Sequence, residues 1–227
     1  MLTAPPRKIE GRKLSRKIQF ILASGSPRRK ELLAGLGLGF RVVVPDIDES
    51  FMQGETPQSH TRRLARQKAE AVAVAYPDRW VLGADTIVLI DGRILGKPKS
   101  EAEAFRMLNT IQGRVHRVIT SFCIMRSDPH ARVCRTVISR VRMRSLTGRE
   151  IGCYIKTAEP MDKAGSYAVQ GIGASLVQSV HGSYTNVVGL PLAEVILEME
   201  RLGVCGLFAP RSSSGRGEQS RIRGEDA

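Results

Sequence analysis

The chain has 227 residues, of which 42% are hydrophobic and 25% are charged, a balance that is ordinary for a globular protein with a real core. No apolar run approaches the roughly 20 residues needed to span a bilayer, and the run 18–23 is too short for the core of a signal peptide, so we expect a cytoplasmic protein without a membrane partner. The formal net charge is +13, and an aromatic content of only 5% disfavours a nucleic-acid platform built on base stacking.

The basic charge is not confined to the ends of the chain, because about +7 remains when the two flanks are set aside. We predict a basic flexible arm over residues 1–17, a folded domain over 18–205 and a disordered tail over 206–227. A basic domain favours an anionic ligand.

The four cysteines show neither a CxxC pair nor zinc-like spacing to histidine. We expect each of them to be a small buried hydrophobe in a reducing compartment. They are Cys123, Cys134, Cys153 and Cys205.

The first predicted elements are a buried strand over 18–23, a break at residues 24–26 and a helix that begins at Pro27. Ser26 is the expected N-cap and Gly37 the expected residue after the helix. Such a helix start presents free N–H groups that attract phosphate. Arginine at positions 28 and 29 opposes the helix dipole there, which indicates either a functional exception or two solvated side chains.

A short strand over 40–44 precedes an acidic segment at residues 45–49, which is either a solvated turn or part of a site. A helix is then predicted over 57–76, stopped by Pro77. Lys68 lies on its apolar stripe. Its ammonium group either extends to solvent or reaches an anion in a cleft.

Asp85 is the strongest candidate for a functional residue, since it is the one acid inside the apolar strand predicted over 80–90. A buried carboxylate needs a partner, a metal ion or an altered pKa. The Asp91-Gly92 pair predicts a hairpin turn, which returns the chain towards Lys97 beside the strand of Asp85.

The rest of the chain continues the alternation of strands and helices. Capping boxes at Ser100 and Thr147 predict two helices, and strands are predicted over 115–125, 132–143 and 175–180. Residues 161–173 are predicted as a glycine-rich polar stretch, 186–191 as a turn, and a last helix begins at Pro191. In the strand 132–143, arginines alternate with apolar residues and indicate a solvated basic face more than a nucleic-acid surface. The expected fold class is α/β with a mixed sheet.

Six motifs, taken together and in this order, resemble the Maf family of nucleoside triphosphate pyrophosphatases, also known as septum-formation inhibitor proteins. The resemblance covers roughly residues 18–203. The motifs are Leu22-Ala23-Ser24-Gly25-Ser26-Pro27-Arg28-Arg29, Gly83-Ala84-Asp85-Thr86, Gly96-Lys97-Pro98, Asp162-Lys163-Ala164-Gly165-Ser166-Tyr167, Gln170-Gly171 and Asn186-Val187-Val188-Gly189-Leu190-Pro191.

The resemblance implies an elongated mixed sheet with flanking helices, related to the inosine-triphosphate pyrophosphatases, and a cleft between two lobes. It implies a homodimer, a divalent cation (Mg²⁺ or Mn²⁺) and hydrolysis of a nucleoside triphosphate to the monophosphate and pyrophosphate. Asp85 would be the catalytic acid or base, and Glu49 would assist it or the metal. The phosphate-binding residues would be Ser24, Arg28, Arg29, Lys68 and Lys97.

Arg29, Thr86 and Gln170 match the branch of the family that is similar to the dTTP/UTP pyrophosphatases, as opposed to the branch acting on 7-methyl-GTP. Thr86 and Gln170 would read the pyrimidine edge. In the mechanism we expect, Asp85 activates a water that attacks the α-phosphorus. Phosphoryl transfer requires positioning and charge neutralisation, which this residue set supplies.

Two alternatives remain open at this point. A non-catalytic regulator that binds a nucleotide or a division partner would use the same basic residues but has no need of Asp85. A nucleic-acid-binding module is the weaker alternative, suggested by the net charge and by Arg140, Arg142 and Arg144.

Overall fold

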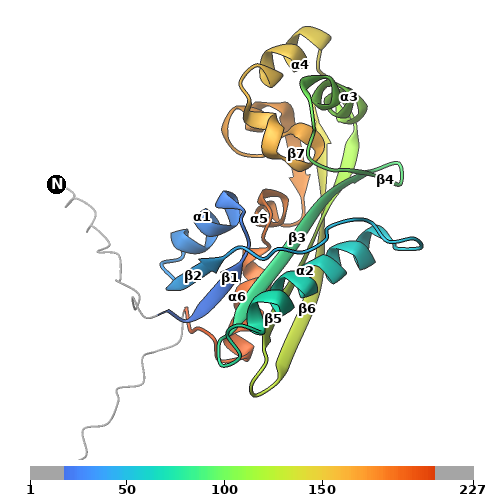
Figure 1. Cartoon of the computed structure of the whole chain (residues 1–227). Helices are drawn as coiled ribbons and strands as arrows, with labels where there is room; N and C mark the ends of the chain where they lie inside the picture. Colours follow the sequence, from blue (N-terminus) through green and yellow to red (C-terminus); the bar gives the residue numbers. More distant parts are fainter. Residues whose placement is uncertain (1–17, 208–227) are drawn as a thin grey trace, which may run out of the picture.

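The computed structural model describes residues 18–207, which form one mixed sheet with helices on both faces (Figure 1). The predicted arm 1–17 and the tail from residue 208 lie outside the described residues. The strands are β1 Phe20–Ala23, β2 Phe40–Val43, β3 Val81–Ile90, β4 Arg93–Leu95, β5 Val115–Arg126, β6 Ala131–Met143 and β7 Val177–His181. The helices are α1 Pro27–Gly35, α2 Pro57–Ala73, α3 Glu101–Ile111, α4 Gly148–Ile155, α5 Tyr184–Val188 and α6 Leu192–Arg201, with short 3₁₀ turns η1 Glu159–Asp162, η2 Ala164–Ser166 and η3 Gly171–Leu176.

The strand order is β2-β1-β3-β5-β6-β7, and β4 pairs with β3 as a hairpin. The strand β1 is parallel to both β2 and β3, whereas the pairs β3–β4, β3–β5, β5–β6 and β6–β7 are antiparallel. The expected α/β class with a mixed sheet is therefore confirmed.

The long strands β3, β5 and β6 run through two lobes, as Figure 1 shows. In the first lobe, α1 and α6 pack on one face of the sheet around Phe20, Leu82 and Phe122, and α2 packs on the other face around Ile21 and Val81. In the second lobe, α3 and α4 cover the halves of β3, β5 and β6 that contain Val88, Val118 and Val141. Side chains that alternate along each strand build these separate cores.

One local prediction differs from the structure. The segment 184–188 forms the short helix α5 where a turn was expected, because the Ser183 hydroxyl accepts a hydrogen bond from Asn186 N and caps it. The stretch 161–173 is organised into 3₁₀ turns. Leu207, the last of the described residues, packs against the first core and donates its N–H to Glu200.

The expectation for the cysteines is wrong for three of the four. Cys123 on β5 and Cys134 on β6 are direct cross-strand partners and form a disulfide. Cys153 is exposed, and Cys205 is the buried free cysteine of the described part of the chain. Linear spacing does not reveal strand register, which is what pairs the first two.

Within residues 18–207, the helices are all too short or too polar to cross a membrane.

Candidate active site

A cavity of about 1000 Å³ opens between the two lobes, beside the carboxyl end of β1 and the start of α1. Crevices at the carboxyl ends of parallel strands are where open α/β sheets place their ligands. The cavity lining includes all nine side chains that the sequence singled out: Ser24, Arg28, Arg29, Glu49, Lys68, Asp85, Thr86, Lys97 and Gln170.

A gap in the pairing of β3 creates the room for this cavity. On this edge, β1 pairs with β3 only as far as Gly83, and β4 pairs with it only from Val88 onward. Between these points the edge of β3 has no neighbouring strand from the described part of the chain. Asp85 and Thr86, which point to opposite faces of the sheet by strand alternation, therefore both reach the cavity.

Asp85 forms an ion pair with Lys68 that is almost closed off from solvent. Lys68 Nζ on α2 lies 2.8 Å from Asp85 Oδ1 and 2.8 Å from Glu49 Oε1. Asp85 and Lys68 are 7% and 8% exposed, whereas the Glu49 side chain is largely exposed. Lys68 therefore reaches the cleft, as one of the two sequence alternatives predicted, and holds the two carboxylates close together.

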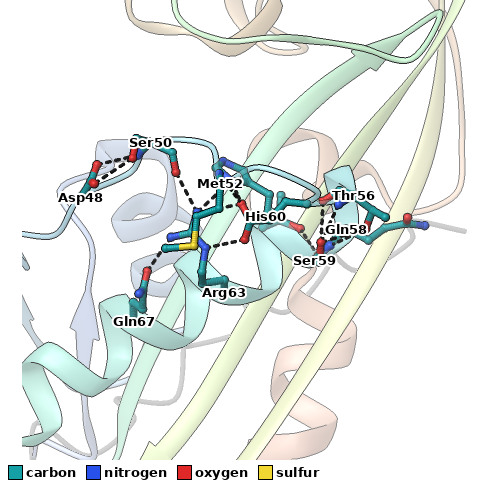
Figure 2. A network of polar contacts seen from close by, with 11 residues as sticks. Asp48, Ser50, Met52, Thr56, Gln58, Ser59, His60, Arg63 and Gln67 are labelled. Carbon is teal, nitrogen blue, oxygen red and sulfur yellow. Dashed lines mark hydrogen bonds and ion pairs between the residues drawn. The ribbon is translucent and has the colours of Figure 1, made fainter.

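A polar network holds the loop that carries Glu49 against α2 (Figure 2). Arg63 donates two hydrogen bonds to the carboxylate of Glu55 and one to the carbonyl oxygen of Ser50. The hydrogen bond from Arg63 is the main cause that lowers the pKa of Glu55 to about 2, with a further contribution from His60. Because Arg63 and Lys68 share α2, the network places Glu49 beside Lys68.

Gly83 allows α2 to lie against β3. A Cβ atom at this position would be 2.3 Å from Ala65 O and 2.7 Å from Ala69 N, both backbone atoms of α2. This close contact sets the distance between α2 and β3, and therefore how far the Lys68 side chain must extend to reach Asp85.

We predict that Gly83→Ala lowers the free energy of unfolding by about 1–3 kcal/mol, since the added methyl group must push α2 away from the sheet. The same shift separates Lys68 from Asp85 and lowers turnover. Urea unfolding and initial rates measure the two effects. Gly152→Ala on α4, where a Cβ meets nothing within 4 Å, is the control; a loss of stability as large as that of Gly83→Ala would refute the explanation.

Arg29 is buried and bonded to the protein, contrary to the solvated alternative. Its guanidinium donates to Gly189 O at 2.8 Å, Ala84 O at 2.8 Å, Ser24 Oγ at 3.1 Å and Thr86 Oγ1 at 3.0 Å. Burial lowers the pKa of Arg29, an effect that the negative charge of Asp85 opposes. Arg29 thus closes the open edge of β3 at Ala84 and orients two hydroxyls of the cavity.

The start of α1 leaves donors free for an anion. Ser26 is the N-cap, as predicted, but its hydroxyl makes no capping hydrogen bond. Arg28 extends across the cavity to Asp162 of the second lobe, at 3.3 Å, and Lys163 also pairs with Asp162, at 2.6 Å. Asp162 and Lys163 belong to the motif 162–167 but were not among the predicted site residues.

Lys97 and Gln170 lie on the second-lobe side of the lining, and their side chains make no hydrogen bond or ion pair with residues 18–207. The Thr86 hydroxyl already has hydrogen-bond partners, since it contacts Thr120 Oγ1 at 2.9 Å as well as Arg29. Of the two residues expected to read the base, Gln170 is therefore the one whose side chain is free to do so.

Sequence reasoning assigned no role to Tyr167, although it lies in a quoted motif, or to His116, which contacts it. Tyr167 lines the cavity, and its hydroxyl lies 2.7 Å from Nε2 of the buried His116. Burial lowers the pKa of His116 to about 4, so the ring is neutral near pH 7. The sequence signals for this pair were the motif that ends at Tyr167 and a lone histidine in an apolar strand.

The carboxylates fit a divalent cation that arrives with its ligand. Among residues 18–207, no group of three or more His, Cys, Asp or Glu side chains is placed to hold a metal ion. In nucleotide sites, however, Mg²⁺ is held by one or two carboxylates together with the phosphates of the substrate. Glu49 and Asp85, which share one ammonium group, meet that requirement.

The start of α1, the basic side chains and the two carboxylates together define an anion site suited to a polyphosphate group. The Maf-like protein family matches residues 19–202, and the chain belongs to this family. A relative from Geotalea uraniireducens (strain Rf4), named dTTP/UTP pyrophosphatase, is 49% identical over 187 residues, covering 82% of this chain and 96% of the relative.

A relative from Geobacter sulfurreducens, with the same name, is 47% identical and covers 82% of this chain and 98% of its own length. Among solved structures, the Staphylococcus aureus Ham1 protein has a TM-score of 0.45 and 17% identity, covering 80% of this chain and 98% of that one.

Proposed function

We propose that the protein hydrolyses dTTP and UTP to the nucleoside monophosphate and pyrophosphate. The observation that carries this proposal is the buried carboxylate of Asp85, held beside Lys68 and Glu49 in a cavity that begins at the N-terminus of α1. The relatives, which are named dTTP/UTP pyrophosphatases, support the reaction and the pyrimidine substrates.

In this proposal, the free N–H groups at the start of α1 and the side chains of Arg28, Lys68 and Lys97 bind the triphosphate. Lys68 exchanges part of its contact with the carboxylates for a phosphate oxygen. Such preorganised cations stabilise the charge that develops on the phosphate oxygens during displacement.

Asp85 takes the role of general base. Only its Oδ1 is bonded to Lys68, and Oδ2 accepts no hydrogen bond from residues 18–207. The free oxygen is available to a water molecule, from which it removes a proton as the water attacks the α-phosphorus. A divalent cation at Glu49 and Asp85 would supply charge neutralisation of the phosphates.

The test is a panel of nucleoside triphosphates assayed for pyrophosphate release with Mg²⁺, with Mn²⁺ and with a chelator. We expect release from dTTP and UTP, little from purine triphosphates, and loss of release with the chelator. Absence of release from every triphosphate would favour the alternative of a non-catalytic nucleotide-binding regulator.

Gln170 offers a separate test of base selection. We expect Gln170→Glu to change the ratios of kcat/KM among dTTP, UTP and CTP by about tenfold. The reason is that an amide both donates and accepts hydrogen bonds at the base edge, whereas a carboxylate only accepts them. Values of kcat/KM for each nucleotide measure this change. Thermal unfolding should stay as in the parent protein; an unchanged ranking would remove Gln170 from base recognition.

We also propose a cytoplasmic homodimer. The resemblance to the family supports it, and so does the exposure of apolar side chains on the edge strand β2 and the loop after it. These side chains are Val42, Val44, Phe51 and Met52. Sedimentation equilibrium would distinguish a dimer from a monomer, and a monomer at all concentrations would refute this assembly.

A further inference from the structure

A second hollow lies on the far side of α2 from the active-site cavity. It is a groove of about 410 Å³ between α2 and the neighbouring end of β6. The active-site cavity is lined by His60, Leu64 and Lys68 of the same helix, none of which lines this groove. The groove is lined by Ser59, Arg62, Arg63, Arg66, Arg132 and Cys134.

The charges in the groove are poorly balanced. Arg63 is neutralised by Glu55 in the network of Figure 2. Arg66 and Arg132, one from each wall, share the carboxylate of Glu70 at 3.8 Å and 3.4 Å. Within residues 18–207, Arg62 has neither an ion-pair nor a hydrogen-bond partner. Two positive charges therefore remain in excess after pairing.

Cations that converge from a helix and a strand repel one another, and a bound anion relieves that repulsion. A guanidinium presents its donors as a planar fork that matches phosphate oxygens, and arginines on two walls suit an anion with more than one phosphate. A volume of this size accommodates a small molecule.

We propose that this groove is a second anion site, distinct from the active site, that binds a small polyphosphate such as pyrophosphate or the triphosphate of a nucleotide. A long nucleic-acid backbone is a different occupant, because it would extend to the exposed Arg140 and Arg142, which lie further along the same face of β6 as Arg132.

The experiment is a calorimetric titration of the full chain with inorganic pyrophosphate in the absence of divalent metal. We expect two classes of site in the parent protein. Arg62→Ala combined with Arg132→Ala should weaken one class about tenfold or more, because it removes one cation from each wall. Arg140→Ala combined with Arg142→Ala is the matched control and should keep both classes.

Four further measurements decide the ligand class and the independence of the site. Phosphate should bind more weakly than pyrophosphate, and citrate should not compete for the groove; equal binding of citrate would overturn the phosphate class. A labelled 20-nucleotide RNA whose binding depends on Arg140 and Arg142 would assign this face to nucleic acid instead. Triphosphate turnover should stay within about twofold of the parent value in the Arg62→Ala/Arg132→Ala variant. The proposal of a second anion site and the proposed reaction can therefore be refuted independently of each other. A single class of pyrophosphate site, unchanged in that variant, would refute the groove.

Discussion

Asp85→Asn is expected to lower kcat for dTTP by at least about a hundredfold and to leave the fold intact, because an amide cannot remove a proton from the attacking water. Lys68 keeps a carboxylate partner in this variant, since Glu49 Oε1 also lies 2.8 Å from its ammonium nitrogen. The change should therefore fall on kcat much more than on thermal unfolding. Single-turnover rates and calorimetry measure the two quantities.

The chain offers a matched control in Asp91→Asn. Asp91 is an exposed carboxylate that pairs with Arg114 at 2.6 Å, at the end of the same strand and outside the cavity. Its φ of 49° suits asparagine. Turnover should remain at the level of the parent protein. Retained turnover in Asp85→Asn would show that another group acts as the base.

Arg29→Lys is expected to lower the free energy of unfolding by about 2–4 kcal/mol even though the positive charge is kept. The four hydrogen bonds of Arg29 go to acceptors in different directions, which a single ammonium nitrogen cannot all reach. Buried acceptors left without a donor each cost about 1–3 kcal/mol. Turnover should fall in parallel, because Ser24 and Thr86 lose their orientation. Urea unfolding with parallel rate measurements tests both effects.

Arg28→Lys is the comparison for stability. Arg28 precedes Arg29 on α1, but among residues 18–207 its side chain makes one polar contact, an exposed one to Asp162 at 3.3 Å. Its replacement should therefore change the free energy of unfolding by less than about 0.5 kcal/mol. If Arg29→Lys were equally stable, Arg29 would act only as a charge towards phosphate, and the positioning role would be wrong.

Much of this site could be predicted from local patterns. The strand, the small-residue break and the helix over residues 18–37 follow from residue types that act on their immediate neighbours. Asp85 was marked by being an isolated acid in an apolar strand, and Lys68 by its place on an apolar helix stripe. In both cases a charge within a hydrophobic pattern requires a partner, and the structure shows that they are partners of each other.

Other features had no local signal. Arg29 could equally have been solvated, because its acceptors Ala84 and Gly189 lie 55 and 160 residues away in the chain. The pairing of Cys123 with Cys134 depends on the register of β5 against β6. The pair of Tyr167 and His116 depends on how the second lobe folds back over β5.

By itself, the sequence determined the alternation of strands and helices, the basic character of the protein and the side chains available to bind a polyphosphate and act on it. These properties depend on residue type and short spacing. The tertiary structure alone decided that β1 and β4 leave the edge of β3 open between Gly83 and Val88, and that α2 lies close enough for Lys68 to reach Asp85. Strand register and helix–sheet distance arise from contacts between distant segments, and periodicity along the chain does not encode them.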